Sequence, residues 1–196
     1  VTQILDITIT EVNDAPIAYA FSVSTNEEEA VSINLLDLIE DIDGESFKRE
    51  NILLSSSLYG SLTMNAFGEV TYLAKENYFG TDSFSYSVKD SEGSYSNEAV
   101  IEVNIFNVND APIIWNNFKD QSVRAGEQAR IILNNNLFKD IDGDELTLTL
   151  AMQDGSDLPD WLEFDAERGV ITSNPATGDV GKLELLLSAS DAEYST

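Results

Sequence analysis

Apolar and polar residues alternate along several segments of this chain. Phe84, Tyr86 and Val88 are separated by serines, and the same two-residue period recurs in residues 101–105 and 146–150. Such alternation is typical of antiparallel strands with one buried face, and no segment keeps the period of an amphipathic helix. Turn signals that contain glycine separate the alternating segments. The pattern therefore predicts an all-β protein.

Two short motifs each occur twice. Val-Asn-Asp-Ala-Pro-Ile stands at residues 12–17 and 108–113, and Asp-Ile-Asp-Gly stands at residues 41–44 and 140–143. The copies are offset by roughly 100 residues, which is the size of a small β-sandwich domain. We therefore expect a tandem repeat of two β-sandwiches.

The repeat also defines the expected domain boundaries. One sandwich is expected at residues 13–108 and the other at residues 109–196. Residues 4–12 alternate as the segment before the second motif copy does, so we interpret residues 1–12 as the last strand of a preceding repeat. The second sandwich would lack its own last strand, because the sequence stops shortly after Asp191. Either residues 4–12 complete the second sandwich of another molecule by strand exchange between truncated molecules, or the ends are disordered in solution.

The chain is strongly acidic. It has 36 acidic and 10 basic residues among 196, which gives a formal net charge of −26. Phosphate binding needs clustered lysine and arginine, so nucleic acid and anionic membranes are disfavoured as partners. Cations are the natural partners, although acidity that only maintains solubility is the simpler alternative for any single carboxylate.

The absence of histidine and cysteine limits the chemistry of the chain. Catalytic triads of the Ser-His and Cys-His kinds are excluded, and no phosphate-binding glycine loop is present. Two aspartates one residue apart at a domain end do not flank a substrate groove as glycosidase carboxylates do. We therefore expect no enzymatic activity, and without disulfides a bound metal is the candidate for extra stability outside the cell.

Sandwich topology predicts where the acidic loops meet. The chain enters such a sandwich at the end to which the loops after the second and sixth strands return. For the second sandwich, the candidate ligands at this end are Asn109, Asp110, Asp140, Asp142 and Asp191. For the far end of the first sandwich, they are Glu28 in the run Glu27–Glu29, together with Glu76 and Asp82. Grouped carboxylates repel one another unless a cation enters, and oxygen ligands in this number favour Ca²⁺.

The entrance of the first sandwich repeats half of this pattern. The candidate ligands there are Asn13, Asp14, Asp41, Asp43 and Asp90. We expect weaker binding at this position, because the domain that would supply the other half is represented only by its last strand. For both Asp-x-Asp-Gly copies, an acidic turn without metal stays an alternative, since aspartate and glycine favour turns by themselves.

Motifs in each half of the chain resemble those of known repeat families. The first half carries Gly60-Ser61-Leu62-Thr63, Gly68-Glu69-Val70-Thr71-Tyr72 and Asn77-Tyr78-Phe79-Gly80-Thr81-Asp82-Ser83-Phe84. It resembles the bacterial cadherin-like or immunoglobulin-like tandem repeats of long surface adhesins. The second half carries Phe138-Lys139-Asp140-Ile141-Asp142-Gly143-Asp144 and Leu158-Pro159-Asp160-Trp161-Leu162. It is similar to the dystroglycan-type cadherin-like module.

The resemblance implies two immunoglobulin/cadherin-like Greek-key sandwiches that bind Ca²⁺ between domains. The ligand roles implied for Asn109, Asp110, Asp140 and Asp142 are specific, whereas those for Asp191, Glu76, Asp82 and the glutamate run around Glu28 are less so. Ala111 stands where the animal cadherin linker has its final asparagine, so the number of ions per junction stays open.

Two functions follow from these observations. In the first, the chain is a calcium-stiffened repeat of an extracellular bacterial adhesin, and its partners are calcium and neighbouring repeats. In the second, the modules themselves bind polysaccharide, an identical module on another cell (homophilic recognition) or another cell-surface protein, with Trp115, Tyr19 and Tyr95 as exposed candidates. Trp161, between Pro159 and Leu162, is expected to pack in or near the core instead.

Overall fold

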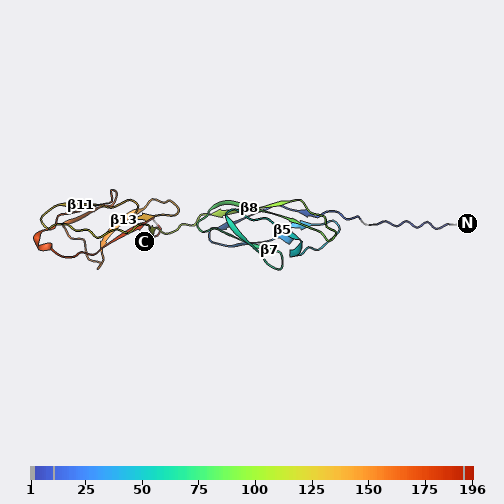
Figure 1. The fold of residues 1–196 in the computed structure, drawn as a ribbon, viewed down its shortest axis with the longest axis horizontal. Coiled ribbons are helices and arrows are strands. Elements are labelled where there is room, and N and C mark those ends of the chain that lie inside the picture. Colours follow the sequence, from blue (N-terminus) through green and yellow to red (C-terminus); the bar gives the residue numbers. More distant parts are fainter. Residues whose placement is uncertain (1–2, 11, 192) are drawn as a thin grey trace. The chain divides into compact units, whose positions relative to one another are not determined.

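The computed structural model of this chain describes residues 3–10, 12–191 and 193–196. The chain divides into two compact units, Val1–Val108 and Asn109–Thr196, and the strands of each run along that unit (Figure 1). In the described residues the helices are short 3-10 turns, and none has the length and apolar character needed to cross a membrane. The predicted all-β architecture is confirmed.

The first unit is built from short strands linked by turns and 3-10 helices. In chain order its elements are β1 (Ile17–Ala18), β2 (Phe21–Asn26), β3 (Val31–Asn34), η1 (Leu35–Leu38), β4 (Ile39–Glu40), η2 (Arg49–Asn51), β5 (Ile52–Leu54), β6 (Gly60–Met64), β7 (Glu69–Ala74), β8 (Gly80–Val88) and β9 (Ala99–Phe106).

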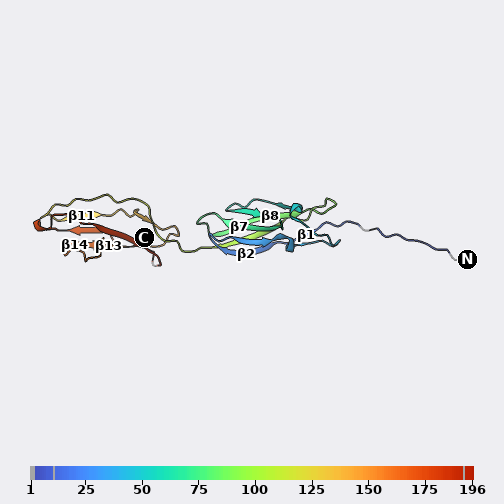
Figure 2. The same ribbon diagram turned by 90° about the horizontal axis from the view of Figure 1, so that it is seen from below.

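Two sheets form the sandwich of the first unit. One has the strand order β2-β9-β8-β5 and the other has the order β3-β7-β6, while β1 pairs with β4. Strands β2 and β9 run parallel, and the remaining pairs of this unit are antiparallel. Strands β2, β7 and β8 can be followed in the turned view of Figure 2.

The core of the first unit lies between these sheets. The predicted inward face of β8 is confirmed, because Phe84, Tyr86 and Val88 are 3%, 1% and 0% exposed. Ile101 and Val103 on β9 are also fully buried and join the same cluster. Alternation in the sequence therefore identified the buried faces of both long strands.

The second unit has the same kind of architecture with shorter strands. Its elements are β10 (Ile113–Ile114), β11 (Ala129–Ile132), β12 (Phe138–Lys139), β13 (Thr147–Met152), β14 (Leu162–Asp165), β15 (Val170–Ser173), η3 (Thr177–Asp179) and β16 (Leu185–Ser190). The sheets have the orders β11-β15-β14, β13-β16 and β10-β12, and every pair is antiparallel. Strands β11, β13 and β14 are labelled in Figure 2.

The second core is smaller than the first. Leu133, Leu137, Leu162 and Ile171 are its buried residues, and Trp161 packs against them while half-buried, as expected from the sequence. At the last described residues, the Ala189 and Thr196 backbones exchange two hydrogen bonds of 3.0 and 2.9 Å.

The segment before the first unit forms no strand in its described residues. Residues 3–10 and 12 have no assigned secondary structure, and the side chains of Leu5, Ile7 and Ile9 are exposed. The role of this segment as a strand of another repeat stays a prediction.

Candidate metal centre

The segment that enters the second unit is held by two acidic loops. The side-chain amide of Asn109 donates to Oδ2 of Asp191 at 3.0 Å, and the backbone N–H of Asp110 donates to Oδ2 of Asp142 at 2.7 Å. Asp191 follows β16, and Asp142 lies in the loop after β12. The structure thus brings together four of the five candidate ligands predicted here, and the fifth, Asp140, belongs to the Asp142 loop.

The carboxylate of Asp191 is held in its charged form. Its Oδ1 accepts backbone N–H groups of Glu193 and Tyr194 at 2.7 and 2.6 Å. The bond from the Tyr194 backbone, with help from the Asn109 amide, lowers the pKa of Asp191 below its ordinary value. Asp191 is therefore a fixed negative charge that orders its own loop and the incoming segment.

The loop after β12 contains carboxylate oxygens that are buried without a partner. Asp140 is only 7% exposed; its Oδ1 accepts the Asp144 backbone N–H at 3.1 Å, while its Oδ2 has no hydrogen-bond partner. Oδ1 of Asp142 is buried and unpartnered as well. An unsatisfied buried carboxylate oxygen is costly, and an oxygen-seeking cation would relieve that cost.

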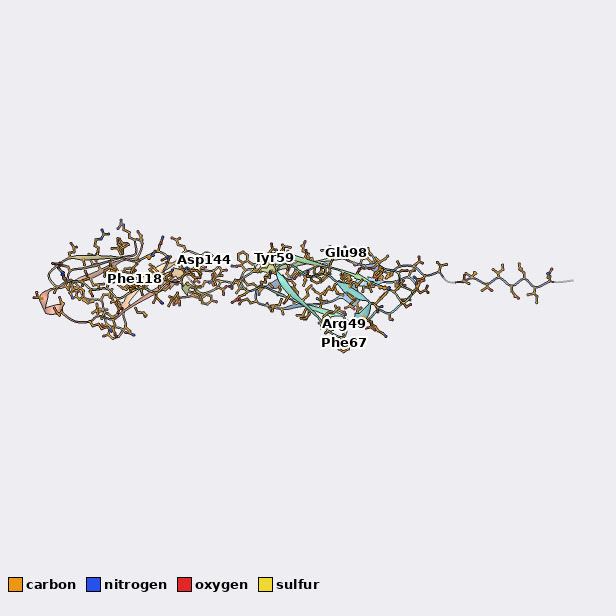
Figure 3. All side chains as sticks on the ribbon, in the orientation of Figure 1. Arg49, Tyr59, Phe67, Glu98, Phe118 and Asp144 are labelled. Carbon is orange, nitrogen blue, oxygen red and sulfur yellow. The ribbon has the colours of Figure 1, made fainter. Side chains whose placement is uncertain are left out.

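A third carboxylate completes a group in this loop. Oxygens of Asp140, Asp142 and Asp144 all lie within 4.8 Å of one another. Ca²⁺ takes oxygen ligands at about 2.3–2.6 Å, so two ligands of one ion are at most about 5 Å apart. The three side chains therefore fit one Ca²⁺. Figure 3 labels Asp144 at the end where the chain enters the unit.

The sequence-based candidate ligands omitted Asp144. The signal was present, because Asp-Ile-Asp-Gly continues directly into a third aspartate at residue 144. Gly143 has a φ of +84°, a left-handed conformation that favours glycine, and it reverses the chain between Asp142 and Asp144. This local turn is what returns the third carboxylate to the first two.

The first unit repeats the arrangement at its own entrance. The Asn13 amide donates to Oδ2 of Asp90 at 2.8 Å, and the Asp14 backbone N–H donates to Oδ2 of Asp43 at 2.7 Å. The Asn13 amide is the main cause that lowers the pKa of Asp90 below its ordinary value. Oδ2 of Asp41 is buried without a partner. All five residues of the predicted half site are therefore gathered within this unit.

At the opposite end of the first unit, the structure favours Glu27 over the predicted Glu28. Glu27 is 4% exposed; its Oε1 accepts the Val108 backbone N–H at 2.7 Å, and its Oε2 is buried without a partner. Glu28 is exposed and has a left-handed φ of 61°. A buried acidic oxygen thus lies in the residue that holds Val108, directly before Asn109.

Asp82 and Glu76, the other candidates at this end, have different environments. Asp82 is buried, and its two oxygens accept hydrogen bonds from four donors: the Leu58, Tyr59 and Ser83 backbone N–H groups and the Tyr72 hydroxyl. Burial of the Tyr72 ring, together with the hydrogen bond from its hydroxyl to Asp82, raises the pKa of Tyr72. Glu76 is exposed on the turn before β8. The geometry favours a structural role for Asp82.

Comparison with known families agrees with the two units. Residues 13–107 match the bacterial cadherin-like domain, and residues 111–196 match an Ig-like domain. A search of curated proteins finds no significant match to the chain.

Solved structures that match the chain include adhesion proteins and enzymes. The human desmocollin-1 ectodomain is 11% identical with a TM-score of 0.50, and the match covers 94% of this chain and 39% of that one. Drosophila N-cadherin is 15% identical with a TM-score of 0.32, covering 95% and 50%. An endo-fucoidan hydrolase of glycoside hydrolase family 107 is 16% identical with a TM-score of 0.39, covering 93% and 27%. The chain spans 27% to 33% of the length of three such hydrolases.

Proposed function

We propose that this chain is a calcium-binding segment of a bacterial surface adhesin. Residues 13–107 belong to the bacterial cadherin-like family, and residues 111–196 belong to the Ig-like family. Domains of these kinds are typical of adhesion-type extracellular modules. In this proposal the chain spaces and stiffens a longer protein, and it performs no catalysis itself.

The observation that carries the proposal is that each unit contains buried carboxylate oxygens without a hydrogen-bond partner. Oδ2 of Asp140 and Oδ1 of Asp142 lie in the loop that holds Asp110. Oε2 of Glu27 belongs to the side chain that holds Val108. Protein hydrogen bonds satisfy the other oxygens of these carboxylates, so the unsatisfied ones favour a ligand that accepts electron pairs.

A bound calcium ion would supply positive charge where carboxylates converge. Asp140 and Asp142 would hold it in the second unit. The segment that enters this unit is already hydrogen-bonded to it through Asn109 and Asp110. Neutralising the surrounding carboxylates removes the repulsion that otherwise loosens this segment, and the segment becomes stiffer.

The expected affinity fits an extracellular setting. Calcium sites in extracellular modules commonly have dissociation constants of about 10⁻⁴ to 10⁻³ M. Such sites are empty at cytosolic calcium levels and filled in sea water or tissue fluid. The proposed stiffening would therefore begin outside the cell.

Thermal unfolding of the full chain tests this function. Excess chelator is compared with 5–10 mM calcium, and the double variant Asp140→Asn, Asp142→Asn is measured beside the wild type. Binding to the folded state alone raises the melting temperature, so the wild type is expected to gain stability and the double variant to lose most of that gain. The matched control is Asp157→Asn, Asp160→Asn, which removes two exposed charges from the same unit. An identical wild-type melting curve with and without calcium would refute the proposal.

Ligand recognition by exposed aromatic residues is the alternative function. Trp115, Tyr95 and Tyr19 are 57%, 53% and 43% exposed. However, the Lys139 ammonium lies 4.9 Å from the Trp115 ring centre, and the Lys89 ammonium lies 5.3 Å from the Tyr95 ring centre. Each lysine covers one face of its ring, which leaves less ring surface for a sugar to stack on at Trp115 and Tyr95 and favours the spacer role. A polysaccharide array separates the two functions, because a spacer retains no glycan.

A further inference from the structure

We propose that the loop at residues 140–144 is a self-contained calcium site in which Asp144 is a ligand. We further propose that the matching loop of the first unit is closed instead by a latch, the pair of hydrogen bonds from Ser91 to Glu45. This inference rests on the proposed calcium function and deepens it. It assigns a ligand set to one loop of the second unit and predicts that the two repeats respond differently to calcium.

Two carboxylates of the loop each keep one buried oxygen that has no hydrogen-bond partner. Asp140 uses Oδ1 to accept the Asp144 backbone N–H, which leaves Oδ2 buried and unpartnered. Asp142 uses Oδ2 to accept the Asp110 backbone N–H, which leaves Oδ1 buried and unpartnered. Hydrogen bonds therefore fix both side chains without using the oxygens that a cation needs. Such fixed ligands lose little freedom when an ion binds.

Asp144 supplies the remaining ligand from the solvent side. Its side chain is exposed, whereas Asp140 is buried and Asp142 is half-buried. The exposure of the three carboxylates thus increases from Asp140 to Asp144. An ion can therefore enter from solvent and keep water molecules as further ligands. Ca²⁺ accepts six to eight oxygens in loose geometry, which suits an incomplete protein set of this kind.

The first unit has the same loop with one decisive difference. Glu45 stands at the position that corresponds to Asp144, and its carboxylate accepts hydrogen bonds from Ser91. The Ser91 hydroxyl donates to Oε1 at 2.5 Å and its backbone N–H donates to Oε2 at 3.0 Å. Both oxygens of Glu45 are therefore used to join the 41–45 loop to the loop of Asp90.

The second unit has no serine at the position that corresponds to Ser91, so its sequence lacks the donor for such a latch. The residue after Asp191 is Ala192, which lacks the hydroxyl that Ser91 carries after Asp90. The third acidic side chain is also shorter, aspartate in place of glutamate. Among the described residues, Asp140, Asp142 and Asp144 are the group whose carboxylate oxygens converge within metal-binding distance. One repeat thus closes its loop with serine, and the other is arranged to close it with a cation.

Calcium titration of the full chain by calorimetry tests this assignment, with calcium chloride added to chelator-treated, dialysed protein. The variants are Asp144→Asn and the matched control Glu45→Gln, which removes one charge from the corresponding position of the other repeat. Asp144→Asn is expected to lose one bound ion, or to bind it at least about tenfold more weakly, because ligand charge sets affinity in such sites. Glu45→Gln is expected to keep the wild-type number and affinity of ions. Equal binding by Asp144→Asn and wild type would overturn the inference.

A third variant tests whether the site is self-contained. Asn109→Ala removes the bond between the incoming segment and the Asp191 loop but leaves the 140–144 loop unchanged. The ion that depends on Asp144 is expected to remain bound in this variant, and its loss would show that the loop is not sufficient. Melting curves in chelator confirm that each variant is folded. Failure of the broader calcium function is distinguishable, because wild type itself would then bind no calcium at millimolar concentration.

Discussion

Asn109 donates its side-chain amide to Oδ2 of Asp191 at 3.0 Å, across 82 residues of sequence. In the first unit, Asn13 makes the same bond to Asp90 at 2.8 Å. The asparagine of each Val-Asn-Asp-Ala-Pro-Ile motif therefore ties the start of its unit to the loop that follows the strand β16 or β8. This bond gives the repeated motif a structural role that is independent of metal.

Replacement of Asn109 by alanine should loosen the second unit even without calcium. The Asp191 carboxylate would lose a donor that stabilises its charge, while its two backbone donors remain. We expect the melting temperature of the second unit in chelator to fall by roughly 4–8 °C, the change typical of losing one good interaction in a domain of this size. Differential scanning calorimetry measures it. Asn116→Ala, which removes an exposed asparagine amide bonded to the Asn136 carbonyl, should change it less.

Acidification should destabilise the first unit through Asp90. Its pKa is lowered in the folded state, so its stabilising contribution is fully present above the unfolded value near 4 and is lost as the pH falls toward the folded value. Urea unfolding in chelator at pH 7, 5, 4 and 3 should show this loss. The variant Asp90→Asn should be less stable at pH 7 and less sensitive to acid. Glu76→Gln, an exposed control, should keep the wild-type pH dependence.

A substitution at Asp82 should change the stability of the first unit without changing its calcium binding. Asp82→Asn replaces one acceptor oxygen with an amide that faces donors such as the Tyr72 hydroxyl and the Tyr59 backbone N–H. We expect a loss of about 2–4 kcal/mol in the free energy of unfolding, because buried donors are left without an acceptor. Urea titration measures the loss, and calorimetry should show unchanged calcium affinity. A large fall in affinity with little loss of stability would identify Asp82 as a ligand instead.

Gly60 reports on the packing of the first core. A Cβ atom at Gly60 would lie 2.3 Å from the ring of Tyr72, which is completely buried and cannot easily move. Gly60→Ala should therefore reduce the free energy of unfolding by about 1–3 kcal/mol through overpacking. The control Gly181→Ala meets no atom within 4 Å and should be nearly neutral. Equal effects of the two variants would show that the Tyr72 ring adapts.

The sequence predicted the long strands better than it predicted their packing. Alternation placed Phe84, Tyr86 and Val88 on a buried face because β8 lies inside a four-stranded sheet. The same alternation around Leu148 and Leu150 gave only half-buried side chains, because β13 pairs with β16 alone in the described sheet. The two-residue period of apolar side chains identifies the inward face of a strand. How deeply that face is buried depends on how many neighbouring strands cover it.

The candidate ligands show a similar division. Repetition of motifs suggested Asn109 and Asp142, since each repeat binds its entering segment with the same pair of acidic loops. It did not identify Asp144, whose return to the group depends on the left-handed turn at Gly143. Sandwich topology suggested Asp82, because an acidic residue near a domain end is indistinguishable in sequence from one that accepts hydrogen bonds from buried donors. Hydrogen-bond partners, which follow from tertiary packing, separate these cases.

Two adjacent glutamates allow the sharpest test of which acidic residue of the first unit contributes to calcium binding. Glu27 and Glu28 have the same side chain, but Glu27 is buried with an unpartnered Oε2, and Glu28 is exposed on a left-handed turn. Glu27→Gln should weaken calcium binding at this end of the first unit by about tenfold and leave the ion of the 140–144 loop unchanged. It removes a charged ligand, while the side-chain oxygen can still accept the Val108 N–H. Glu28→Gln removes the same charge one residue away and should bind as wild type does. Calorimetric titration of both variants at the same ionic strength decides between them: equal weakening would mean that general charge, and not a specific ligand at Glu27, controls calcium affinity.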